Sequence, residues 1–140
     1  MRYLLDTCVV SEPTKRIPNA RAMQWLASVP IADTWLSSVT IGEIQKGVYI
    51  LDDNSPLRRR LMEWLDKVQE AYAGRILAFD EATALLWGRL VGTSSRAGHP
   101  RPYADSQIAA TALRHGMMLV TRNVRDMADF GVEIVNPFDE

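Results

Sequence analysis

The chain has 140 residues, of which 47% are hydrophobic and 24% are charged, and this composition predicts a single globular domain spanning residues 1–140. The net charge of −1 excludes the global basic field of many nucleic-acid-binding proteins, and no apolar run approaches the roughly 20 residues that cross a bilayer. A single cysteine, Cys8, excludes an internal disulfide and, with no signal-peptide pattern at the start, predicts a cytoplasmic protein without a membrane partner.

Strands and helices are predicted to alternate along the chain. Short apolar runs bounded by turn residues predict strands at residues 3–6, 34–38, 75–79, 117–121 and 132–135. Capping residues and prolines predict helix starts at residues 11–13, 18–19, 40, 55–56, 80 and 103, with a short helical turn near residue 126. This alternation predicts an α/β fold with three layers, in which a mainly parallel sheet lies between helices.

Four acidic residues fall where a strand has just ended or a helix is starting: Asp6, Glu43, Asp105 and Asp126. In an open parallel sheet these positions gather at one edge, so we expect the carboxylates to converge. Converging carboxylates repel one another and raise one another's pKa, unless a divalent cation lies among them. Oxygen ligands suit Mg²⁺ or Mn²⁺, so the pattern predicts a metal-dependent hydrolase acting on a phosphodiester.

Each acid also has a structural interpretation when it is taken singly. Asp6 can end a strand at a turn, and Asp126 can cap the short turn near it. Glu43 stands three residues after Thr40, which is the spacing of a helix capping box. Asp105 falls in the first turn of a helix, where the helix dipole favours a negative charge. Only their shared location at one sheet edge favours a catalytic role.

Other chemistries find less support in the sequence. His99 and His115 lack zinc-ligand spacing with each other or with Cys8, and Cys8 is expected to be a small buried residue rather than a nucleophile. A signalling receiver domain needs a late lysine, and none follows Lys67. A haloacid-dehalogenase-type phosphatase needs a second aspartate two residues after the first, and this chain has Cys8 at that position.

Seven segments, in order and nearly end to end, resemble a PIN-domain nuclease. They comprise residues 4–7, 11–13, 36–44, 79–80, 104–112, 121–123 and 135–138. The chain is most similar to the VapC-type toxins of bacterial toxin–antitoxin pairs, in the FitB-like branch. Each segment is weakly specific alone, whereas the ordered set is specific.

The resemblance implies a five-stranded parallel sheet and an Mg²⁺-dependent endoribonuclease, in which Mn²⁺ can substitute and a metal-activated water hydrolyses RNA. It implies that Asp6 and Asp105 are the principal metal ligands and that Glu43 completes the set directly or through water. Asp126 is counted among the catalytic acids because it is expected at the same sheet edge, not because the resemblance assigns it. Thr7 and Thr121 are expected to orient the carboxylates. The resemblance further implies a homodimer and a cognate antitoxin protein, with operator DNA bound only through the antitoxin complex.

Two positions depart from the family pattern. The residue two after the first aspartate is often asparagine in the family, but here it is Cys8, which cannot make the same hydrogen bonds. The position of the fourth acid is taken by the neutral Asn123, and Asp126 is the nearest acid. Either of these residues can fill the fourth position, and the number of metals at rest stays open.

The basic residues near the acids suggest a way to hold RNA. Arg101, Arg122 and Arg125 flank the later acids, and a planar guanidinium can bind two phosphate oxygens. Any one of them can equally be a solvated surface residue. Two further alternatives are an inactive PIN-fold binding module and a housekeeping RNA-processing nuclease that has no antitoxin.

Overall fold

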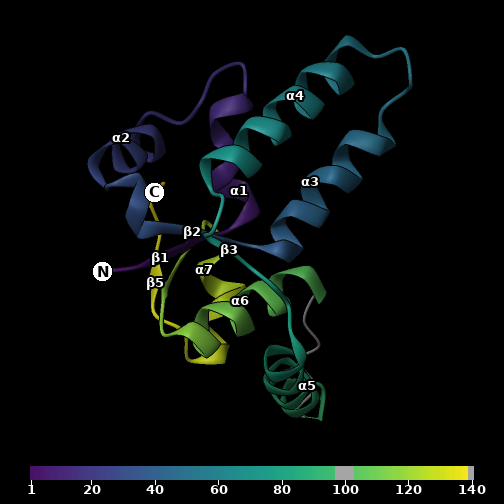
Figure 1. Cartoon of the computed structure of the whole chain (residues 1–140). Helices are drawn as coiled ribbons and strands as arrows, with labels where there is room; N and C mark the ends of the chain where they lie inside the picture. Colours follow the sequence, from purple (N-terminus) through teal and green to yellow (C-terminus); the bar gives the residue numbers. More distant parts are fainter. Residues whose placement is uncertain (97–102, 139–140) are drawn as a thin grey trace.

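A computed structural model of the chain describes residues 1–96 and 103–138, and its centre is a parallel sheet (Figure 1). The five strands lie in the order β3-β2-β1-β4-β5, with every neighbouring pair parallel. Their bounds are β1 (Tyr3–Leu5), β2 (Thr34–Ser37), β3 (Ile76–Leu77), β4 (Met118–Val120) and β5 (Ile134–Val135). The predicted strands are confirmed, although each is shorter than predicted because its flanking residues turn into a loop or helix.

Helices connect the strands, and none in the described part of the chain is long and apolar enough to cross a membrane. The predicted caps Asn19, Ser55 and Asp80 are confirmed, since each side chain accepts a hydrogen bond from the first turn that follows it. The helices are α1 (Thr7–Val10), α2 (Ala20–Ser28), α3 (Ser38–Ile50), α4 (Pro56–Ala71), α5 (Glu81–Arg96), α6 (Tyr103–His115) and α7 (Val124–Met127). Short 3₁₀ turns are η1 (Glu12–Thr14), η2 (Ile31–Asp33) and η3 (Ala128–Phe130).

One predicted helix start is wrong, and another is confirmed only as a 3₁₀ turn. The turn η1 follows Ser11 as predicted, but the Ser11 side chain does not cap it; its hydroxyl donates to the Thr7 carbonyl at 2.7 Å and closes α1 instead. Helix α3 begins at Ser38 rather than at residue 40, because the Ser37 hydroxyl accepts the Val39 amide at 3.0 Å. The loop predicted over residues 99–102, with His99 and Arg101, lies outside the described residues.

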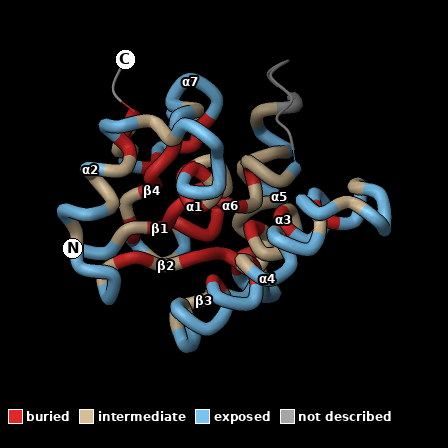
Figure 2. The backbone as a smooth tube through the Cα atoms, turned by 90° about the horizontal axis from the view of Figure 1, so that it is seen from above, coloured by how far each residue is buried: buried red, intermediate tan, exposed pale blue. Residues whose placement is uncertain are grey.

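Alternating side chains on each strand separate the core into two layers. Leu5 and Val120 pack on one face of the sheet against helices α1 to α4. Leu4 and Leu119 pack on the other face against helices α5 to α7. Figure 2 shows β1, β2 and β4 as mostly buried segments between these helices. The three-layer α/β/α prediction is therefore confirmed.

Candidate active site

Asp6 lies at the carboxyl end of the central strand β1 and is only 2% exposed. Its Oδ1 accepts the Thr7 amide at 2.8 Å, so the capping role that the sequence allowed is real. Its Oδ2 accepts the Thr121 hydroxyl at 2.7 Å, which reaches across from the end of β4. Burial raises the pKa of Asp6 in spite of these hydrogen bonds. The fold therefore holds this carboxyl group rigidly where its charge is costly.

Glu43 lies in the second turn of α3, on the side that faces α1. Because α3 begins at Ser38, Glu43 is not the third residue of a capping box, and that interpretation is wrong. Its Oε1 accepts the Thr7 hydroxyl at 2.6 Å. Thr7 thus contacts two acids at once, since its main-chain amide donates to Asp6.

Asp105 is half-buried in the first turn of α6. Because α6 leads back to the start of β4, its first turn lies at the carboxyl edge of the sheet. Burial and the negative charges of Asp6, Glu43 and Asp126 raise the pKa of Asp105 to about 6. The structure therefore brings the other three predicted acids within electrostatic reach of Asp105.

The two candidates for the fourth position both follow β4. Asp126 is exposed on α7, and its negative charge is one of those that raise the pKa of Asp105. Asn123 is half-buried, and its main-chain amide donates to the Thr121 hydroxyl at 3.0 Å. Asn123 thus supports the Thr121 contact to Asp6, while Asp126 supplies the additional charge.

The donor set fits a hard divalent cation in charge and in ligand type. The site is lined by carboxylate and hydroxyl oxygens, and in the described part of the chain no basic side chain contributes to the raised pKa values of Asp6 and Asp105. Across residues 1–96 and 103–138, no group of three or more acidic, histidine or cysteine side chains is arranged so that it could hold a metal ion as it stands. The acids are therefore gathered at one edge without forming a closed cage.

Cys8 lies nearer to the acids than the sequence indicated. It is half-buried rather than buried, and its Sγ lies 3.8 Å from Asp6 Oδ2 and 3.9 Å from the Thr121 hydroxyl. Burial, followed by the charge of Asp6, raises the pKa of the Cys8 thiol. A thiol that stays protonated is a poor nucleophile, so Cys8 borders the site without the properties of a catalytic cysteine.

Two charged residues beside the site make structural contacts. The Arg122 guanidinium lies 3.9 Å from the centroid of the buried Phe138 ring, which it covers. Glu12 is 2% exposed; its carboxylate pairs with Lys15 at 2.9 Å and accepts the Asn19 amide at 2.7 Å. No pattern in the sequence indicated that Glu12 would be buried, because these contacts depend on how η1 and α2 pack.

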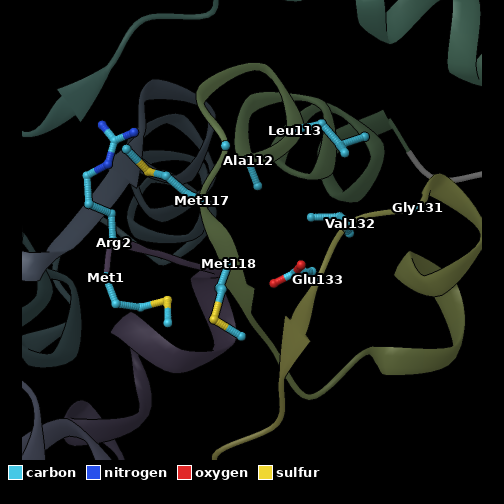
Figure 3. Close-up of a pocket in the computed structure, with 10 residues that line it drawn as sticks. Met1, Arg2, Ala112, Leu113, Met117, Met118, Gly131, Val132 and Glu133 are labelled. Atoms are coloured by element: carbon cyan, nitrogen blue, oxygen red, sulfur yellow. The ribbon is translucent and has the colours of Figure 1, made fainter.

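A cavity lies where the strands begin, at the edge of the sheet opposite to these acids, and Figure 3 shows its lining residues. It has a volume of about 470 Å³ and is bordered by the residues that begin β1 and β4, including Arg2 and Met118, and by Glu133 before β5. None of the four acids lines this cavity. The candidate active site is therefore a site at the carboxyl edge rather than this cavity.

A parallel α/β sheet with acids gathered beyond its strand ends defines the class, and comparison with known proteins gives the family. Residues 3–132 match the PIN domain, and the chain belongs to the PIN domain family. It is 36% identical over 138 residues to Toxin FitB of Neisseria gonorrhoeae, covering 98% of this chain and 99% of that protein. It is 31% identical over 138 residues to VapC ribonuclease Y4jK of Sinorhizobium fredii, covering 97% of each.

A solved structure agrees closely with the fold. The crystal structure of FitAcB from Neisseria gonorrhoeae matches with a TM-score of 0.90 and 35% identity, covering 99% of both chains. The resemblance that the sequence motifs indicated is thereby confirmed at the level of fold and family.

We expect Asp105→Asn to stabilise the cation-free protein at neutral pH. The pKa of Asp105 is raised from 3.8 to about 6 on folding, so the folded state binds more protons than the unfolded state between these values. The contribution of Asp105 to stability should therefore rise as the pH falls from about 7 to about 4, so the advantage of Asp105→Asn over wild type should shrink in parallel. Thermal unfolding in EDTA measures both proteins, with the exposed Glu70→Gln as control. A difference in Tm that does not depend on pH would contradict this assignment.

We expect Thr121→Val to lower the free energy of unfolding by about 1–3 kcal/mol, because the buried Asp6 carboxylate loses a hydrogen-bond donor. The amide of Asn123 loses its acceptor in the same variant. Thr121→Ser keeps the hydroxyl and should stay close to wild type. Urea denaturation of the three proteins at neutral pH measures the effect. Equal stability of the valine and serine variants would show that the hydrogen bond contributes little.

Proposed function

We propose that this protein is an Mg²⁺-dependent endoribonuclease that hydrolyses RNA phosphodiester bonds and acts as the toxin of a toxin–antitoxin pair. The observation that carries the proposal is the convergence of Asp6, Glu43, Asp105 and Asp126 at one edge of the sheet, where, among the described residues, the only charges that shift the pKa of Asp105 are negative. Two relatives that align along nearly the whole chain are named as a toxin and as a ribonuclease.

Each residue of the site has a distinct part in the proposed reaction. Asp6, Glu43 and Asp105 would hold the cation, and Asp126 or Asn123 would fill the fourth position of the site. Thr121 keeps Asp6 in place through its hydroxyl, and Thr7 does the same for Glu43. When bound, Mg²⁺ or Mn²⁺ supplies positive charge against the phosphate and lowers the pKa of a water molecule.

The open position of the site favours unpaired RNA as substrate. The acids lie at the sheet edge, and Asp126 is exposed to solvent. Single strands and loops can present their backbone to such an edge, whereas the regular A-form duplex is recognised mainly by its shape. With a net charge of −1, the protein depends on the cation and on local arginines for attraction to phosphate.

An antitoxin and a second copy of the chain are the proposed protein partners. One solved structure of 35% identity and TM-score 0.90 is titled as FitAB bound to a DNA fragment. By analogy, a cognate antitoxin covers the site of this protein and supplies the contacts to operator DNA. The near-neutral charge of this chain supports an indirect contact with DNA. The proposed setting is the cytoplasm, where RNA and antitoxin are both present.

The nuclease activity is tested by incubating the purified protein with unstructured RNA in Mg²⁺ and in EDTA. We expect cleavage only with Mg²⁺, and a loss of at least about 100-fold in Asp6→Asn and Asp105→Asn, because each removes a charged ligand. Glu70→Gln, which changes an exposed acid on α4, should cleave like wild type. If either aspartate variant retained full cleavage, the proposed site would be wrong. An inactive binding module would cleave under none of these conditions.

The toxin role is tested by expressing the chain in bacteria that lack its partner. We expect growth arrest by wild type and none by Asp6→Asn, because arrest depends on RNA cleavage. Co-expression of the product of a short neighbouring gene with a DNA-binding pattern should restore growth, and colony counts measure both effects. Cleavage in vitro without growth arrest would instead favour a housekeeping RNA-processing nuclease.

A further inference from the structure

A groove of about 400 Å³ lies between α3 and α4, which form a helical hairpin (Figure 1). Each helix contributes four lining residues spaced by three, one and three positions, so each set occupies one helix face. We call this feature the α3–α4 groove. Its lining residues are Ser38, Ile41, Gly42 and Gln45 from α3, and Met62, Leu65, Asp66 and Gln69 from α4.

The groove begins one residue away from the candidate active site. Gly42 lines the groove, while the next residue, Glu43, contacts Thr7. Neighbouring residues on a helix point about 100° apart, so α3 presents the acid on one side and the groove on the next. Gly42 is exposed, and no atom lies within 4 Å of a Cβ placed on it. No side chain of residue 42 therefore stands between Glu43 and the groove, so a ligand can contact both.

The lining of the groove combines apolar and polar groups. Leu65 is buried and Ile41 is half-buried, so these side chains offer an apolar floor. Gln45, Asp66 and Gln69 are exposed at the rim. A carboxamide both donates and accepts hydrogen bonds, whereas a carboxylate at neutral pH only accepts. This combination suits the flat face and polar edge of a nucleobase, and the negative Asp66 disfavours a phosphate.

We propose that the α3–α4 groove binds one unpaired RNA base that carries an exocyclic amino group, beside the phosphate to be cut. Asp66 accepts from the amino group, and the carboxamides of Gln45 and Gln69 complete the base edge. Adenine, cytosine and guanine carry such an amino group, and uracil does not. The groove volume lies within the range of about 300–1,000 Å³ for small-molecule sites, so one base fits. This inference rests on the proposed ribonuclease function and assigns its sequence preference.

The test fills the groove without touching the acids. Gly42→Leu places a side chain in the groove, and Gly47→Leu is the matched control, because Gly47 is an equally open glycine of α3 that does not line it. Both changes replace glycine within a helix by a better helix former, so both variants should fold. Short unstructured RNAs that differ by one base at each position around a single cut measure cleavage, and thermal unfolding verifies folding.

We expect wild type and Gly47→Leu to cleave at least about fivefold better when one position beside the cut carries an amino-bearing base instead of uracil. Gly42→Leu should lose this preference while it still cleaves RNA, and Asp66→Asn should weaken it. The same preference in Gly42→Leu as in wild type, or no preference in wild type, would overturn the inference and leave the nuclease proposal intact.

Two other results would also overturn the inference. A wild-type protein that cleaves no RNA would remove the ribonuclease proposal and this inference with it. A Gly42→Leu variant that keeps the base preference but escapes growth rescue by the antitoxin would assign the groove to a protein partner.

Discussion

The hydrogen bond between the Thr121 hydroxyl and the buried Asp6 carboxylate joins the two adjacent strands β1 and β4 at the edge where the acids meet. The main chain makes the same connection, because the Asp6 amide donates to the Val120 carbonyl at 2.9 Å. A buried carboxylate is tolerated only when fixed donors replace its water, and these donors are the amide of Thr7, the first residue of α1, and the hydroxyl of Thr121, the residue after β4. The position of Asp6 therefore depends on strand register and cannot shift without breaking the sheet.

The other acids lie near Asp6, and the repulsion between their negative charges is felt most at Asp105. Asp6, Glu43 and Asp126 all act on Asp105 in the direction that disfavours its charge. A sheet edge selected for stability alone would place cations or neutral residues there, because like charges destabilise the folded state. A bound divalent cation reverses the sign of this effect, since it binds the folded state and stabilises it by mass action. The repulsion between the carboxylates at this edge of the sheet thus favours a role in binding a cation.

Local patterns predicted the elements, while long-range contacts determined the details of the site. The caps at Asn19 and Ser55 depend on residues within one turn, and the sequence located both. Ser37 and Thr40 are both reasonable helix starts, and the sequence favoured the wrong one, which also gave Glu43 a wrong interpretation. The surroundings of Cys8 include Thr121, which is 113 residues away. Contacts between residues so far apart in the sequence can be identified only when the order of the strands is known.

Helix α3 carries Glu43 and one wall of the α3–α4 groove on neighbouring faces. A glycine within a helix costs about 0.5–1 kcal/mol relative to alanine, so Gly42 needs a reason other than helix formation. Close packing does not provide one, because a Cβ at Gly42 would meet no atom within 4 Å, and the same is true of Gly47. What distinguishes Gly42 is that it lines the α3–α4 groove directly before Glu43 in the sequence. A side chain at this position would enter the groove beside the acid, which is a reason for glycine here that helix formation does not supply.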